Sequence, residues 1–186
     1  GGAFLLVAGV AGFQGWKAHD LNTRIELSER FVAAQSLANT GKNVDATDAF
    51  NSIAKDSVAG YQMLSRFQLA SLATKQGDLT SAIGSYKKLA DDDSIDAIYR
   101  DLALVLGALV ELDAKSGGLG LIDRASELAS SHSPWRFTAK EVVALSALKT
   151  GNIKTARSRY KELSMEAAAP QGLQTRAQNM LDMLAN

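Results

Sequence analysis

The stretch GDLTSAIGSYKKLADD, residues 77–92, recurs later in the chain as GNIKTARSRYKELSME, residues 151–166. The two copies begin 74 positions apart and place a Gly, an Ala, a Tyr and a Leu at matching positions. Similarity of a chain to itself at a fixed spacing is typical of proteins built from stacked structural repeats. The length of the repeat therefore decides which fold to expect.

A related pattern also recurs at about half of this 74-residue spacing. A small residue recurs at spacings of 36, 37 and 37 inside four apolar stretches, at Ala34, Ala70, Gly107 and Ala144. A break follows each stretch, because glycine can adopt the left-handed backbone conformation that ends a helix. The breaks are at Gly41, Gly77, Gly117 with Gly118, and Gly151.

A second helical pattern follows each break. An Ala, an aromatic residue and an aliphatic residue stand at spacings of four and three, which places all three on one helix face. The third unit is degenerate, since it has Leu, Ala and Leu at these places. The four triplets are Ala46, Phe50 and Ile53; Ala82, Tyr86 and Leu89; Leu121, Ala125 and Leu128; and Ala156, Tyr160 and Leu163.

These patterns predict an all-α fold, a solenoid of about four antiparallel helix pairs in which each pair buries its apolar face only against its neighbours. The small residues are expected where two helices approach within roughly 8 Å of one another. A repeat domain is expected over residues 17–186. Its units cover residues 17–56, 57–93, 94–131 and 134–168, followed by a capping helix over residues 170–186.

The capping helix carries an apolar stripe. Its simplest role is to cover the last helix pair, and the alternative is that it docks on a partner. The stripe consists of Leu173, Ala177, Met180, Leu181 and Leu184.

The first sixteen residues, GGAFLLVAGVAGFQGW, carry no charged side chain. A helix of this length rises about 24 Å, which is short of the ~30 Å hydrocarbon core of a bilayer. We therefore expect residues 1–16 to belong to a truncated membrane-anchor helix, with Trp16 near the interface. A remnant of a signal peptide and an ordinary buried helix are the alternatives.

Composition excludes several classes of function. Lys plus Arg and Asp plus Glu both number 20, so the chain has no basic field that would attract nucleic acid. The absence of cysteine excludes disulfides, thiolate nucleophiles and cysteine-ligated zinc. His19 and His132 are isolated in the sequence and do not form a zinc-binding pattern. We expect neither a metal nor a cofactor.

Two short motifs raise the question of an enzyme. Ser52–Lys55 fits S-x-x-K and Lys149–Gly151 fits K-T-G, two of the three motifs of penicillin-interacting enzymes, but the S-D-N motif is absent. Ser52 falls inside the second helix of the first unit, and Gly151 is a repeat turn. We therefore expect no enzymatic activity.

The recurring Ala or Gly, the Gly at the turn, and the Ala, Tyr and Leu that follow resemble the tetratricopeptide repeat. The aromatic residue that usually begins such a repeat is replaced here by Arg30, Arg66, Ala103 and Lys140. More narrowly, residues 134–177 are similar to the C-terminal part of the tetratricopeptide repeat-like family of ancillary SecYEG translocon subunits. The matching features are Pro134-Trp135-Arg136, Ala139, Glu141, the turn and helix from Gly151 to Tyr160, Pro170, Gly172-Leu173 and Arg176-Ala177.

The resemblance implies a single-pass protein of the bacterial inner membrane with its repeat domain in the periplasm. Such a protein works beside the Sec translocon and periplasmic chaperones or other folding factors as a binding scaffold. No ligand-binding residue carries over, because the matching positions are packing positions. A scaffold of a cell-envelope complex unrelated to protein translocation is the alternative function.

Partner binding is expected on the concave side of the stack, which the first helices of the pairs normally line. Phe31 and Phe67 are the candidate anchors for an apolar segment of an unfolded client or a partner protein. The alternative is that both are core residues, since aromatic residues at helical spacing usually are. The residues predicted to face the groove are Ser28, Phe31, Gln35, Leu64, Phe67, Ser71, Thr138 and Glu141.

Overall fold

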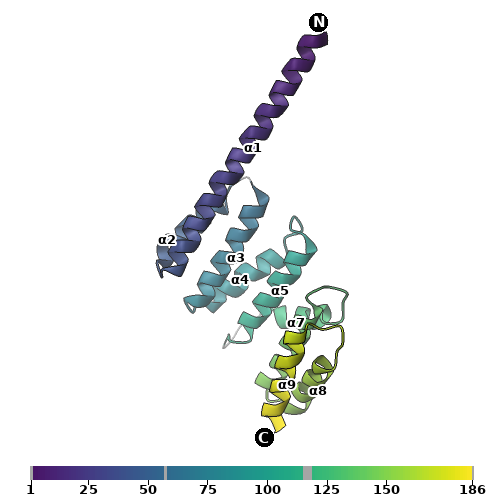
Figure 1. Cartoon of the computed structure of the whole chain (residues 1–186). Coiled ribbons are helices and arrows are strands. Elements are labelled where there is room, and N and C mark those ends of the chain that lie inside the picture. The colour runs from purple at the N-terminus through teal and green to yellow at the C-terminus, as the bar shows by residue number, and fades with distance from the viewer. Residues whose placement is uncertain (1, 57, 115–118, 186) are drawn as a thin grey trace. The chain divides into compact units, whose positions relative to one another are not determined.

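The computed structural model describes residues 2–56, 58–114 and 119–185, with side chains from residue 21 onward. Within these ranges the chain forms nine helices and no strand (Figure 1). The all-α prediction is confirmed.

Short connections join consecutive helices. The first two pairs are α1 (Gly2–Asn39) with α2 (Asn43–Ile53), and α3 (Ala59–Lys75) with α4 (Leu79–Ala90). The next two pairs are α5 (Ala97–Glu111) with α6 (Leu121–Leu128), and α7 (Arg136–Lys149) with α8 (Ile153–Ser164). The last helix, α9 (Gln171–Ala185), follows without a second helix of its own.

The chain divides into two compact units, Gly1–Leu69 and Ala70–Asn186, with the division inside α3. Residues 2–20 belong to helix α1. The predicted anchor, residues 1–16, lies outside the residues whose side chains are described. In the part of the chain that the structure describes, no helix combines the length and the apolar character needed to cross a membrane. The boundary between an anchor and a repeat domain of residues 17–186 stays a prediction.

Helices of the second unit are arranged in two rows. Helix α7 contacts both α5 and α9, so that these three helices form one row. In the other row, α6 packs against α5 and α7, and α8 packs against α7 and α9. Helix α4 lies against α5 (Figure 1). This is the arrangement of stacked helix pairs, in which each pair completes its core with its neighbour.

Three of the predicted glycine breaks are turns of the same construction. Gly41, Gly77 and Gly151 have φ angles of 78°, 80° and 78°. At the second turn the N–H of Asp78 donates to the carbonyl of Ala73 at 3.0 Å, and the N–H of Gly77 donates to the carbonyl of residue 74 at 3.1 Å. This pair of hydrogen bonds defines a Schellman motif, which needs the left-handed conformation that glycine adopts at low cost.

The third break differs from the other three. Gly117 and Gly118 lie outside the described residues, and Gly120 takes the left-handed conformation, with a φ of 74°, directly before α6. Because Gly120 has no side chain to cap the helix, the carboxylate of Glu111 does so from α5. Its Oε2 accepts the N–H of Ile122 at 2.8 Å.

The apolar triplets of the second helices are confirmed as core residues. All twelve are buried, including the degenerate triplet of α6. Of the four recurring small residues, Ala34, Ala70 and Ala144 are fully buried, and Gly107 is buried as well.

Gly107 shows why these positions exclude bulky side chains. A Cβ atom added to Gly107 would lie 2.6 Å from Cδ1 of Leu121 and 2.8 Å from Cβ of Tyr86. Tyr86 comes from α4 and Leu121 from α6, so helices on both sides of α5 meet at this glycine. The packing therefore leaves no room for even one methyl group.

We predict that Gly107→Ala destabilises the protein by about 1–3 kcal/mol, because overpacking outweighs the gain in helix propensity. Gly84→Ala is the matched control. Gly84 lies in helix α4, where an added Cβ meets no atom within 4 Å, so this change should stabilise the protein by about 0.5–1 kcal/mol. Urea denaturation measures both, and equal effects of the two substitutions would contradict the tight packing at Gly107.

Candidate functional site: the interaction surfaces

The residues predicted to face a groove lie in both units. Ser28, Phe31 and Gln35 are half-buried on α1, whereas Leu64 is exposed on α3. The other four are half-buried. Phe67 is in the first unit, and Ser71, Thr138 and Glu141 are in the second. Their role in partner binding stays a prediction.

Phe31 lies in an aromatic cluster of the first unit. Its ring centroid is 5.5 Å from that of Phe50 in an edge-on arrangement, and 5.9 Å from that of Tyr61 in a tilted one. Phe50 is fully buried on α2, and Tyr61 is half-buried on α3. Since such pairs contribute about 0.5–1.5 kcal/mol each beyond simple burial, Phe31 has a packing role whether or not it also contacts a partner.

A basic residue replaces the usual aromatic at the start of two repeats and forms an ion pair there. Nη1 of Arg30 lies 3.2 Å from Oδ2 of Asp56, and Nζ of Lys140 lies 3.1 Å from Oε2 of Glu166. In both cases the acidic partner stands 26 positions later, just after the second helix of the pair. These pairs join the first helix of a repeat to the end of its second helix.

The spacing of 26 residues between the basic residue and its acidic partner can be read from the sequence, although these ion pairs were not predicted. In the second repeat Arg66 and Asp92 have the same residue types at the same spacing. In the degenerate third repeat both positions are alanine, Ala103 and Ala129. Partly exposed ion pairs contribute only about 0–1 kcal/mol each, so those of the first and fourth repeats add little to stability and chiefly link the start of a repeat to its end.

Hydrogen bonds tie α5 to α7 at both ends. At one end the indole N–H of Trp135 donates to the carbonyl of Ile98 at 2.8 Å. At the other end the ammonium of Lys149 donates to the carbonyl of Leu112 at 3.0 Å and also pairs with Asp113. Lys149 of the K-T-G motif therefore has a structural role in its own unit.

The S-x-x-K serine has a structural role too, within the first unit. The hydroxyl of Ser52 accepts a hydrogen bond from Nη2 of Arg30 at 3.0 Å. Ser52 thus belongs to the contacts that close the first helix pair.

A bidentate ion pair joins α7 to α9. Nε and Nη2 of Arg176 each donate to one carboxylate oxygen of Glu141 at 2.9 Å. The hydrogen bond to Glu141 is also the main cause that raises the pKa of Arg176. Glu141, which was predicted to face a partner, is therefore engaged by the chain's own last helix.

Helix α9 covers the last helix pair. Leu173 and Ala177 are buried in the same cluster as Phe137 and Tyr160, and the other three residues of the predicted stripe pack partly buried against it: Met180, Leu181 and Leu184.

The hydroxyl of Tyr160 is buried without a hydrogen-bond partner. Burial, together with the charge of Glu141, raises the pKa of Tyr160 to about 12.

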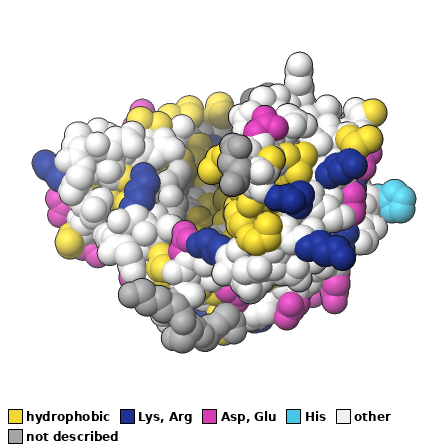
Figure 2. Space-filling view, turned by 90° about the horizontal axis from the view of Figure 1, so that it is seen from below, with side chains coloured by type: hydrophobic (Ala, Val, Ile, Leu, Met, Phe, Trp, Pro, Cys, Tyr) yellow, Lys and Arg dark blue, Asp and Glu magenta, His cyan; other side chains and the backbone are white. Residues whose placement is uncertain are grey.

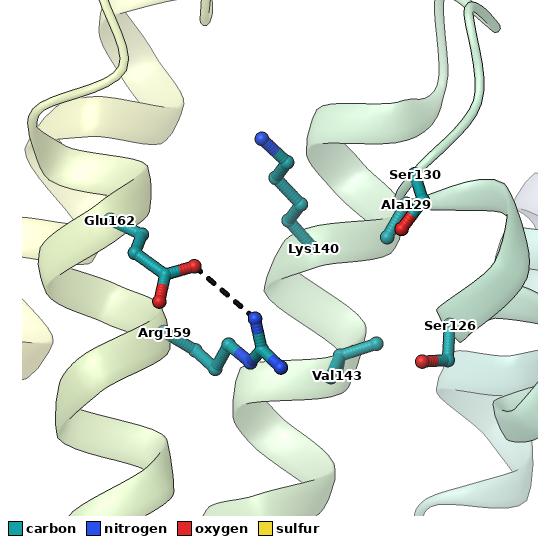
Figure 3. Close-up of a pocket in the computed structure, with 7 residues that line it drawn as sticks. All are labelled: Ser126, Ala129, Ser130, Lys140, Val143, Arg159 and Glu162. Carbon is teal, nitrogen blue, oxygen red and sulfur yellow. Dashed lines mark hydrogen bonds and ion pairs between the residues drawn. The ribbon is translucent and has the colours of Figure 1, made fainter.

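A small polar hollow lies between α6, α7 and α8, with a volume of about 80 Å³. Figure 3 shows Arg159 and Glu162 reaching toward each other from α8, and Ser126 reaching from α6 toward the same space. Nη1 of Arg159 and Oε2 of Glu162 are 3.3 Å apart, and Lys140 pairs with Glu166. Ligand sites usually have about 300–1,000 Å³, so this hollow is too small to enclose a typical organic ligand.

In the part of the chain whose side chains are described, no group of three or more His, Asp or Glu residues could hold a metal ion.

A comparison of the sequence with models of protein families agrees with the helical repeat fold. The model of the tetratricopeptide repeat-like domain matches residues 1–186, so the chain belongs to this family. Domains of this family are generally scaffolds for protein interaction without catalytic activity. No curated protein and no solved structure gave a match.

Tyr160 gives a test of the C-terminal packing. An unfolded tyrosine has a pKa near 10, whereas burial raises the pKa of Tyr160 in the folded chain to about 12. Between these values the folded state binds more protons, so its stability falls as the pH rises. We predict that Tyr160→Phe costs little at neutral pH, because the hydroxyl has no partner, and makes this fall shallower.

The measurement is urea denaturation of the parent chain and of Tyr160→Phe at about pH 7 and about pH 11. Part of the fall should remain in the variant, because burial also raises the pKa of Tyr86. An equal loss of stability in both proteins would show that Tyr160 ionises as it does in the unfolded chain.

Proposed function

We propose that this chain is the periplasmic interaction module of a single-pass protein of the bacterial inner membrane. In this proposal it is a scaffold, without enzymatic activity, that works at the Sec translocon together with periplasmic chaperones. The proposal rests on the resemblance of residues 134–177 to the ancillary translocon subunits and on the uncharged segment of residues 1–16.

The observation that carries the proposal is the continuity of α1. Residues 2–39 form one helix, which enters the first helix pair without a break (Figure 1). If residues 1–16 lie in a membrane, this helix leads directly from the bilayer into the repeats. A repeat unit held next to the membrane is well placed to meet chains that emerge from a translocon.

Several residues match the ancillary translocon subunits, and their contacts support a scaffold rather than a catalyst. Trp135 bonds to the backbone of α5, and Glu141 and Arg176 join α7 to α9. All three are therefore used to hold helices in register. Such residues preserve the shape of a binding surface, which is what a scaffold requires.

The charge distribution favours protein partners. On the face shown in Figure 2, Lys and Arg side chains lie interspersed with Asp and Glu. Nucleic-acid binding depends on basic side chains that neutralise many phosphates together. A surface of mixed charge with exposed apolar side chains is better suited to protein segments.

Leu64 is the most accessible of the apolar side chains predicted to face the groove, since Phe31 and Phe67 are half-buried. It is exposed on α3, one turn before Phe67, while Phe31 is held by the aromatic cluster. We propose that an apolar segment of a client or partner contacts Leu64 and the accessible part of Phe67. Apolar anchors of this kind contribute most of the binding energy at many interfaces.

Site-specific photocrosslinking in native membranes tests the function. A photoreactive residue at Leu64 should capture translocon subunits or periplasmic folding factors, identified by mass spectrometry. Val44 is the matched control, because it is exposed on α2, the second helix of its pair. The same residue at Val44 should capture these partners much less.

Other outcomes would change the proposal. Reproducible capture of a different cell-envelope complex at Leu64 would support the alternative scaffold function. Equal capture at Leu64 and Val44 would contradict binding through the first helices.

A further inference from the structure

Helix α1 has an exposed apolar face that the first unit does not cover. Leu21, Ile25 and Val32 are 57%, 50% and 60% exposed, although all three are large and apolar. Leu27 and Ala34, which lie on the opposite side of the helix, are fully buried. The described part of the helix therefore has two apolar sides, and the first unit buries one of them.

The spacing of this face is that of a coiled coil. Leu21, Ile25, Ser28, Val32 and Gln35 follow one another at alternating steps of four and three, which are the a and d positions of a heptad. A helix with this repeat offers a narrow seam to one partner helix. We call these five residues the α1 seam.

Charges beside the α1 seam indicate what that partner is. In a parallel, in-register pair, position g of one helix meets position e of the next heptad on the other, five residues later. Arg24 occupies position g and Glu29 occupies the following position e. Two copies of this helix would therefore place opposite charges together, and two-fold symmetry would form this ion pair twice.

An antiparallel pair does not offer the same match. In that arrangement g positions face g positions and e positions face e positions, so Arg24 would no longer meet Glu29. The charge pattern thus selects the parallel arrangement, in which both N-terminal ends lie at the same end of the pair.

We propose that the α1 seam binds the same seam of a second copy of this chain, forming a parallel two-fold dimer. The proposal goes beyond the scaffold function and does not depend on it. Three apolar side chains per copy bury much less than the roughly 1,200 Å² of a standard interface. The dimer is therefore weak in dilute solution and strengthened where both copies are held close together.

Disulfide trapping tests the dimer, because the chain has no cysteine of its own. Ser28→Cys and Gln35→Cys each put one thiol on the α1 seam and leave its apolar residues intact. The two positions are one heptad apart, so only a parallel, in-register dimer brings each thiol to its own symmetry mate. Ala33→Cys is the matched control, since Ala33 is exposed on the same helix but lies off the seam.

The full chain in mild detergent should give disulfide-linked dimers with Ser28→Cys and with Gln35→Cys, and few with Ala33→Cys. In the Ser28→Cys background, Arg24→Glu or Glu29→Arg should lower the dimer yield roughly fivefold, because like charges then face each other. The double variant Arg24→Glu/Glu29→Arg should restore the yield. Thermal melting by circular dichroism checks that every variant is folded.

Three results would overturn the proposal. The first is trapping at Ser28 and Gln35 that does not exceed trapping at Ala33. The second is trapping at only one of the two seam positions, which indicates antiparallel pairing. The third is failure of the double charge reversal to restore the dimer in folded protein.

Discussion

Close approach of helices at positions without bulky side chains is the constraint on which this structure depends. At Gly107 the approach is so tight that a Cβ atom would lie 2.6 Å from Leu121 and 2.8 Å from Tyr86. Ala34, Ala70 and Ala144 are fully buried at the corresponding places of the other repeats. Because a single helix pair cannot cover its own apolar face, such contacts are what allow stacked pairs to bury a continuous core.

Much of the fold was predictable, because the length of the repeat and the size of the recurring residues can both be read directly from the sequence. The small residues, the three Schellman turns and the buried triplets all follow from a repeat of about 37 residues. The start of α6 could not be predicted in this way. Its cap is the carboxylate of Glu111, which is on the preceding helix, and a contact between helices is invisible to an argument based on local patterns.

The interaction surface was harder to predict, for a physical reason. Helical spacing gives the direction of a side chain, but it does not tell how far the neighbouring helices extend over it. Phe31 was predicted to face the groove, but its ring packs against Phe50 and Tyr61, and Glu141 is engaged by Arg176. Leu64 is exposed on α3, which makes it the sharper probe of partner binding. The fold thus supports a scaffold of the tetratricopeptide repeat-like family.

Two neighbouring alanines of α1 allow the most direct test of the central constraint. Ala34 is fully buried, whereas Ala33 is exposed. Because both lie in the same helix, Ala→Leu changes helix propensity by the same amount at both positions. Urea denaturation should show that Ala34→Leu loses about 1–3 kcal/mol of unfolding free energy through overpacking. Ala33→Leu should remain within about 0.5 kcal/mol of the parent. Equal stability of the two variants would contradict the claim that close helix contacts at small residues hold this fold together.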